Sequence, residues 1–222
     1  MPISLHFNRE ASIGIGAMIV FIAMVLVAGI AASVLIETSA TLESQSMATG
    51  RETTAEVSTG LTVCAIEGYT ASDSSDISKL AILVRPRAGT DSVDISTCFM
   101  EISDTNKKVI LNYTSSYYSK PSGLDDIFSA NVFPDFGGTG DGTRFGILVL
   151  EDADDSISSS NPLINRGDRV YLCLNTTGVF SDIAERTGIV GMVIPQEGSP
   201  APIDFVTPGT YNDNVMELFW DM

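Results

Sequence analysis

Few side chains of this sequence could carry out acid–base catalysis or bind zinc. The chain has one histidine, His6, and three cysteines, Cys64, Cys98 and Cys173, none of them in a C-x-x-C pair. A Ser-His-Asp triad, a Cys-His pair and an H-E-x-x-H zinc site all require histidine, and His6 lies in an N-terminal segment that we expect to be removed. Catalysis by carboxylates alone would need a distinctive pair among 28 acidic residues, and none stands out. We therefore do not expect an enzyme.

The cysteines leave two interpretations open. Their spacing matches no zinc site. One disulfide could form outside the cell, but three cysteines allow several pairings and the sequence does not choose among them. Burial as small apolar side chains fits the sequence at least as well.

One loop groups several carboxylates. In EDADDS, residues 151–156, Asp152, Asp154 and Asp155 follow a predicted strand. Hard cations such as calcium prefer oxygen-rich loops of this kind. The loop lacks the D-x-D-x-D-G order, and any acidic protein contains such runs. A solvated loop is the preferred interpretation, and calcium bound by these three aspartates is the alternative.

Two tripeptides match the acceptor pattern for N-linked glycans. They are Asn112-Tyr113-Thr114 and Asn175-Thr176-Thr177. Such tripeptides also arise by chance, but each asparagine lies near the end of a predicted strand, where exposure would permit modification. We expect glycans at these sites, with a slight preference for Asn175.

The charge balance excludes two classes of partner. The 222 residues include 12 Lys and Arg against 28 Asp and Glu, which gives a net charge of -16. Such a surface repels nucleic acid and anionic lipid headgroups. The acids are spread along the chain rather than gathered in a tail, which is typical of a surface kept soluble by its charge.

The longest apolar stretch is Ile13–Ile36, IGIGAMIVFIAMVLVAGIAASVLI, where Ser33 is the only polar side chain. As a helix with a rise of about 1.5 Å per residue it would span roughly 36 Å, more than the hydrocarbon core of a bilayer at about 30 Å. Because it is apolar on every side, it must lie in lipid or be surrounded by protein. Small residues one turn apart, such as Ala28 and Ala32, would allow a second helix to approach closely.

The helix is expected to continue through the polar stretch 37–60 and to end at Gly60. After it the pattern changes to short strands separated by turns rich in Gly, Ser and Asp, including DFGGTGDG at 135–142. The predicted strands are 61–67, 79–86, 92–102, 107–114, 144–151, 168–175 and 188–195. This pattern predicts an α+β chain: a long N-terminal apolar helix followed by an all-β, immunoglobulin-like sandwich or barrel.

Two further elements are expected near the C-terminus. SDIAER at 181–186 predicts a short helical turn. The last stretch, 202–222, predicts one or two edge strands, with Phe219 and Trp220 closing part of the core.

The N-terminal motif closely resembles that of archaellins, the archaeal flagellins. GIG at 14–16, IVFIAMVLVA at 19–28, AASVLI at 31–36 and the continuation ETSATLESQS all match. KLAILVRPRAGTDSVDIS and LINRGDRVYLCLN are similar to archaellin segments as well. The resemblance is strong over the first third of the chain and looser beyond it.

The resemblance implies a class III signal peptide cut by a prepilin-type signal peptidase. The domains are then a leader at 1–11, which is removed, a filament-core helix at 12–60 and an outer β domain at 61–222. Counting back from GIG places the cut between Ala11 and Ser12. Ala11 stands where the family usually has Gly, and Glu10 where it has a basic residue, so a cut after Glu10 is the alternative.

The resemblance also implies a structural subunit of the archaellum, the rotary swimming filament, which polymerises with itself or other archaellins. It would lie in the membrane only before assembly, which would need a membrane platform protein and an assembly ATPase. An adhesive type IV pilin-like subunit and a membrane-tethered β-domain binding module are the alternatives. We expect no cofactor, and the expected core positions are Ile13, Ile15, Met18, Phe21, Met24, Val25, Ala28, Gly29, Ala32 and Leu35.

Overall fold

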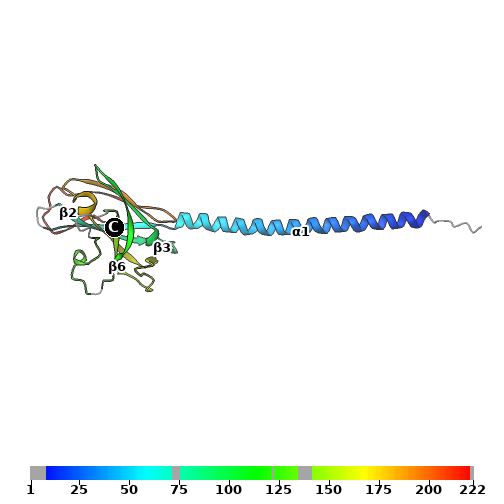
Figure 1. Ribbon diagram of the computed structural model, residues 1–222, viewed down its shortest axis with the longest axis horizontal. Coiled ribbons are helices and arrows are strands. Elements are labelled where there is room, and N and C mark those ends of the chain that lie inside the picture. The colour runs from blue at the N-terminus through cyan, green and yellow to red at the C-terminus, as the bar shows by residue number, and fades with distance from the viewer. Residues whose placement is uncertain (1–8, 72–75, 122, 135–141, 221–222) are drawn as a thin grey trace, which may run out of the picture. The chain divides into compact units, whose positions relative to one another are not determined.

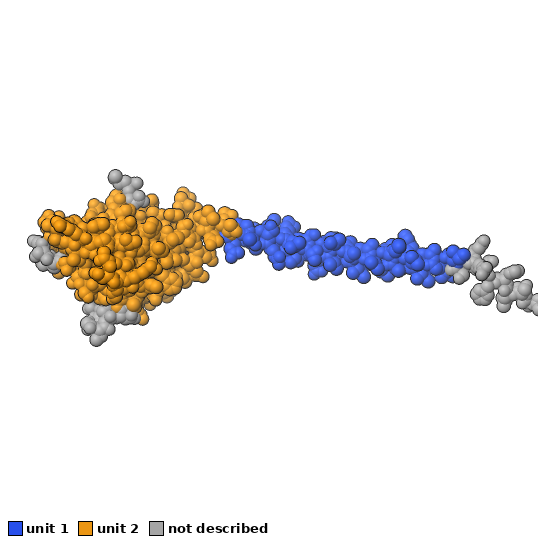
Figure 2. Space-filling model, turned by 90° about the horizontal axis from the view of Figure 1, so that it is seen from above, with its two compact units in different colours: residues 1–52 blue, residues 53–222 orange. Residues whose placement is uncertain are grey.

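A computed structural model describes residues 9–71, 76–121, 123–134 and 142–220, with side chains from residue 13 onward. The chain divides into two compact units, residues 1–52 and 53–222 (Figure 2). His6, most of the expected leader and all but Gly142 of the glycine-rich turn at 135–142 lie outside the described residues.

The first element is the helix α1, Arg9–Ser58, which runs without a break (Figure 1). No proline interrupts it, and at about 1.5 Å per residue its 50 residues span roughly 75 Å. Hydroxyl groups of its polar half donate to the backbone one turn earlier, as Thr41 Oγ1 does to the Glu37 carbonyl at 2.9 Å. Among the described residues it is the one helix long and apolar enough to cross a membrane.

The second unit is built on a nine-stranded sheet with the order β10-β9-β4-β5-β6-β8-β2-β1-β11. A separate pair, β3 and β7, completes the strands. Their bounds are β1 Leu61–Thr70, β2 Ile77–Pro86, β3 Ser92–Asp94, β4 Phe99–Ser103, β5 Lys108–Ser119, β6 Arg144–Glu151, β7 Leu163–Asn165, β8 Arg169–Asn175, β9 Gly188–Ile194, β10 Ala201–Val206 and β11 Val215–Trp220. The predicted fold class, a long apolar helix followed by a β domain, is confirmed.

The sheet curls until it nearly closes. Gly60, just before β1, forms a parallel bridge with Ser199, just before β10, and the Ser199 N–H donates to the Thr59 carbonyl at 2.9 Å. All sheet pairings are antiparallel except β5 with β6. The enclosed face is filled by alternate strand residues, including Ile66, Ile82 and Phe145, each fully buried. This alternation is the period of two that the strands show in sequence.

A second, smaller core covers the outer face of β1, β2, β8 and β6. The segment 123–134, which contains the 3-10 turn η2 (Ile127–Ser129), places Phe128 and Phe133 against that face. Their rings stack with centroids 5.6 Å apart, and Phe128 stacks on Tyr69 at 5.2 Å. Gly146 permits this approach, because a Cβ there would lie 2.1 Å from the Val132 carbonyl oxygen.

Three sequence expectations need correction. Phe219 and Trp220 do lie on an edge strand, but they are 36% and 57% exposed and do not close the core. The short helix is α2, Thr176–Phe180, rather than 181–186, because Asn175 caps it and Ser181 ends it in the left-handed region. The predicted strand 92–102 is broken by the 3-10 turn η1, Ile95–Thr97, which the Asp94 side chain caps.

Candidate functional site

The largest candidate site is the apolar surface of α1. Every described side chain from residue 13 to residue 57 is exposed in the single chain. The large side chains among the expected core positions are 55–72% exposed, namely Ile13, Ile15, Met18, Phe21, Met24, Val25 and Leu35. So much contiguous apolar surface marks a contact with protein or lipid.

The small expected core residues, Ala28, Gly29 and Ala32, are exposed on the same helix. A shallow groove along α1 is lined by Val20, Ala23, Met24, Val27, Ala28 and Ala31. A Cβ added at Gly29 would meet no atom within 4 Å outside the helix backbone. The space at Gly29 is therefore not needed by this chain, but it is available to a neighbouring helix.

The expected cleavage position lies within the described backbone. Ala11 and Ser12 are in α1, two and three residues after its first residue, Arg9. The structure describes no side chain there, so the choice between a cut after Ala11 and one after Glu10 stays a prediction.

The two expected glycan acceptors have different surroundings. Asn112 is exposed on β5, opposite Phe99 of β4, and Thr114 of its tripeptide is buried. Asn175 is half-buried at the end of β8, where its Oδ1 accepts the Thr177 N–H at 3.1 Å. Thr177 Oγ1 donates to Asp182. Asn175 is therefore the more constrained side chain of the two.

The three carboxylates that lie together in the structure differ from the expected set by one residue. Carboxylate oxygens of Asp152, Asp154 and Asp168 lie within 4.8 Å of one another, whereas Asp155 lies 2.9 Å from the Lys120 ammonium. Asp168 is buried and was missed, because it follows the turn before β8 and only the fold brings it to the loop. Hydrogen bonds from Ser156 and Asn165 lower the pKa of Asp154.

This cluster has the ligands that a hard cation prefers, but several are already engaged. Asp168 accepts the Ala153 and Asn165 N–H groups at 3.2 and 2.9 Å. Lys120 lies 3.1 Å from Asp152, and its hydrogen bonds to Asp155 and Asp152 raise its own pKa. Carboxylate oxygens of this kind fit calcium, while Lys120 already supplies positive charge beside them.

Two of the cysteines behave as apolar core residues. Cys98 and Cys173 are buried free thiols. Burial is the main cause that raises the pKa of Cys98 to about 12, and the Asp94 carboxylate adds to it. Burial likewise raises the pKa of the Cys173 thiol. Thiols that stay protonated are poor nucleophiles, so neither is a catalytic candidate.

Comparisons with known proteins agree on one family. The archaeal-type flagellin family model matches residues 11–205. The chain is 40% identical to Flagellin B2 of Methanocaldococcus jannaschii over 204 residues, covering 92% of each protein. It is 41% identical to Flagellin B4 of Pyrococcus abyssi over 221 residues, covering 95% of this chain and 99% of that protein.

Solved structures extend the similarity to the fold. The crystal structure of archaeal flagellin FlaB1 from Methanocaldococcus jannaschii superposes with a TM-score of 0.62 at 30% identity, covering 72% of this chain and 96% of that one. A subunit of the archaeal flagellum of Methanospirillum hungatei superposes with a TM-score of 0.60 at 17% identity, covering 91% and 98%. The second match concerns the fold alone.

Proposed function

The chain belongs to the archaeal-type flagellin family and is a structural subunit of the extracellular archaellum filament. From that premise we propose that it polymerises through the apolar half of α1. The observation that carries this proposal is the exposure of that half. Its large side chains, such as Phe21 at 67%, find no cover among the described residues of their own chain. In a filament, copies of the same helix would supply that cover.

Close packing would favour the filament over the membrane. Lipid tails and leucine side chains are similarly apolar, so moving α1 from lipid to a helix bundle gains little from the hydrophobic effect. Van der Waals contact between closely approaching backbones would supply the difference, and Ala28, Gly29 and Ala32 permit that approach. The acidic β domain would then face the medium.

Before assembly, α1 would rest in the cell membrane with its backbone hydrogen bonds satisfied internally. A prepilin-type signal peptidase would cut between Ala11 and Ser12. A platform membrane protein and an assembly ATPase would extract and add subunits. The subunit itself would be a passive propeller without enzymatic activity.

N-linked glycans would decorate the outer domain. Asn112 is supported by its exposure and Asn175 by its place at the end of β8. Mass spectrometry of filament peptides would report the occupancy of each, together with the N-terminal residue. Unmodified peptides at both sites would refute the glycan proposal.

The experiment on polymerisation is Gly29→Leu expressed in place of the native chain. Leucine is the better helix former by about 0.8 kcal/mol, and apart from the local helix backbone and the two chain neighbours no described atom lies within 4 Å of the new Cβ. The helix should therefore form while its packing against neighbours fails, and filaments should be lost.

Gly50→Leu is the matched control. Apart from the local helix backbone and chain neighbours, Gly50 also has no described atom within 4 Å of an added Cβ, but it lies in the polar half of α1. Gly29→Ala adds less volume and should retain filaments. Normal filaments from Gly29→Leu would contradict packing through this position.

A further inference from the structure

Four arginines surround a cleft in the β domain. Its volume is about 910 Å³, and its basic lining is Arg85 and Arg87 after β2 with Arg166 and Arg169 around the turn before β8. The whole chain has 12 Lys and Arg. A third of its positive charge is therefore gathered at one place, on a protein of net charge -16.

Three acids, Asp91, Glu151 and Asp168, also line the cleft, so its four arginines exceed its carboxylates by one formal charge. Glu151 lies 3.4 Å from Arg169. Asp168 is buried, and its two oxygens accept backbone N–H groups of Ala153 and Asn165. Asp91 is the remaining acid in the lining. Within the described residues no ion pair engages the other three arginines, which are all exposed. Like charges held together without a partner repel one another, so the cleft is suited to receive carboxylates.

The cleft lies where the β domain joins the connection to α1. The Arg87 N–H donates to the Gly60 carbonyl at 2.9 Å, and Thr90 Oγ1 donates to the same carbonyl at 3.2 Å. Thr62, the second residue of β1, also lines the cleft. Gly60 stands between α1 and β1, so this end of the domain is the one tied to the helix by the chain itself.

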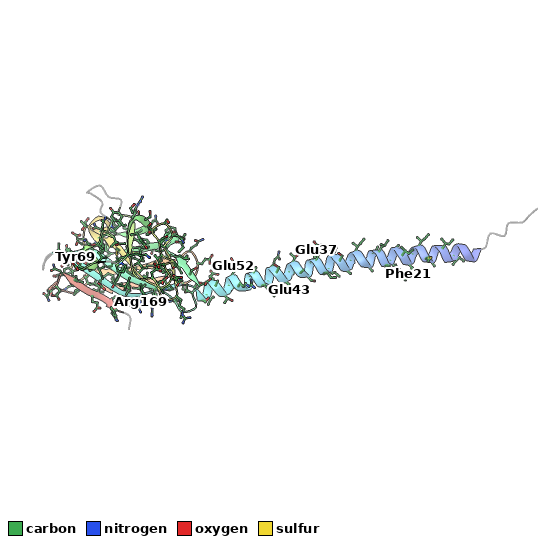
Figure 3. The ribbon with its side chains drawn as sticks, turned by 90° about the horizontal axis from the view of Figure 1, so that it is seen from below. Phe21, Glu37, Glu43, Glu52, Tyr69 and Arg169 are labelled. Atoms are coloured by element: carbon green, nitrogen blue, oxygen red, sulfur yellow. The ribbon has the colours of Figure 1, made fainter. Side chains whose placement is uncertain are left out.

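The polar half of α1 carries the complementary charge. Between residues 37 and 58 it contains Glu37, Glu43, Glu52 and Glu56 against one cation, Arg51. Figure 3 labels the first three of these glutamates along α1. Glu52 and Glu56 stand four residues apart, so they share one face of the helix and repel each other. A cation supplied from outside that helix would relieve this repulsion.

We propose that the arginine cleft of one subunit binds the Glu52 and Glu56 carboxylates of a neighbouring subunit's α1. The proposal rests on the proposed function, in which α1 helices pack together. It adds the second contact that such a filament needs, a charged one that fixes the β domain of one copy against the helix of the next. Electrostatic contacts of this kind set register and partner choice more than raw affinity.

The test reverses the charges on each side and then on both. Arg85→Glu with Arg166→Glu removes two unpaired cations, and both side chains are exposed, so the fold should be kept. Glu52→Arg with Glu56→Arg reverses the other side. Each pair of substitutions should lower the ratio of filament to membrane-bound subunit about tenfold, and the four substitutions together should restore most of it.

Lys108→Glu is the control for reversing one positive charge, to be compared with Arg85→Glu and Arg166→Glu made separately. Lys108 is exposed on β5, away from the cleft lining, and pairs with Glu101 at the surface. This control should leave the filament ratio near that of the native chain. The neutral variants Arg85→Gln and Arg166→Gln should give intermediate losses, and thermal unfolding of the detergent-extracted subunits should be unchanged in all of them.

A native filament ratio from Arg85→Glu with Arg166→Glu would contradict the proposal that the cleft binds Glu52 and Glu56. A variant with all four substitutions that does not recover the filament ratio would contradict it as well. Neither result would touch the packing proposed for α1, which Gly29→Leu tests separately. Normal filaments from Gly29→Leu together with losses in the arginine variants would retain the charged contact and reject the apolar one.

Discussion

The same residue types have opposite surroundings in the two units of this chain. Ile13, Ile19 and Ile22 on α1 are 72%, 62% and 52% exposed, whereas Ile66 and Ile82 in the sheet are fully buried. Figure 3 shows Phe21 standing off α1 without cover. The β domain completes its core from its own sequence, but α1 leaves its apolar surface to be completed by something else. One unit is therefore a completed core, whereas the other leaves its apolar surface exposed.

The largest effect expected from this contrast concerns two phenylalanines. Phe145 is fully buried in the β domain and Phe21 is 67% exposed on α1. Phe145→Ala should lower the free energy of unfolding of the detergent-extracted subunit by about 3–5 kcal/mol, because it leaves a cavity. Phe21→Ala should leave it within about 0.5 kcal/mol of the native value and reduce filaments instead. Denaturant unfolding and filament yield measure the two effects; equal destabilisation by both would break the contrast.

A second pair of phenylalanines tests the same contrast between buried and exposed side chains within the β domain. Phe128, in the segment 123–134 that covers β1, β2, β8 and β6, is 2% exposed, while Phe99 is 50% exposed on the outer face of β4. Phe128→Ala should cost about 2–4 kcal/mol. Phe99→Ala should cost less than about 0.5 kcal/mol. Urea midpoints of the two variants test this, and a larger loss from Phe99→Ala would show that the outer face of β4 has cover within the chain.

Alkaline pH should loosen the β domain and spare α1, which contains neither Cys nor Tyr. Burial raises the pKa of Cys98 from 9.0 to about 12 and that of Tyr113 from 10.0 to about 12. Above pH 9 the thiol ionises in the unfolded chain first, so unfolding releases a proton and stability falls by about 1.4 kcal/mol per pH unit for that group. Its contribution is fully present below pH 9 and is lost as the pH rises to 12.

Unfolding temperatures measured between pH 8 and 11 would follow this loss. In Cys98→Ala the unfolding temperature should fall less steeply with pH above pH 9. Far-ultraviolet circular dichroism should retain the helical signal of α1 as the domain unfolds. An unchanged pH profile in Cys98→Ala would rule out the thiol as its source.

The smallest effect is expected from calcium at Asp152, Asp154 and Asp168. A weak site filled at millimolar calcium stabilises the domain by about 1 kcal/mol, which corresponds to a rise of about 2–4 °C in the unfolding temperature. Asp154→Asn should abolish the rise, and it leaves the buried Asp168 in place. The same rise in Asp154→Asn, or none in the native chain, would leave the solvated-loop interpretation standing.

The sequence by itself determined the elements whose patterns are local. A long uncharged apolar run without proline favours a long helix, and strands such as β9 alternate buried residues with less buried ones on a period of two. The same local motif, GIG followed by IVFIAMVLVA, identified the family that the comparisons then showed. The sequence also indicated Asp152 and Asp154 as candidate cation ligands, because they are neighbours in one loop.

Only the tertiary structure decided what residues distant in sequence do together. Asp168 joined the loop carboxylates, the arginines of two separate turns gathered around one cleft, and Trp220 stayed exposed because β11 ends the sheet rather than closing it. The physical reason is that each depends on which strands pair, and pairing is fixed by the packing of the whole domain. The apolar half of α1 marks the limit of a single chain, because its cover must come from outside.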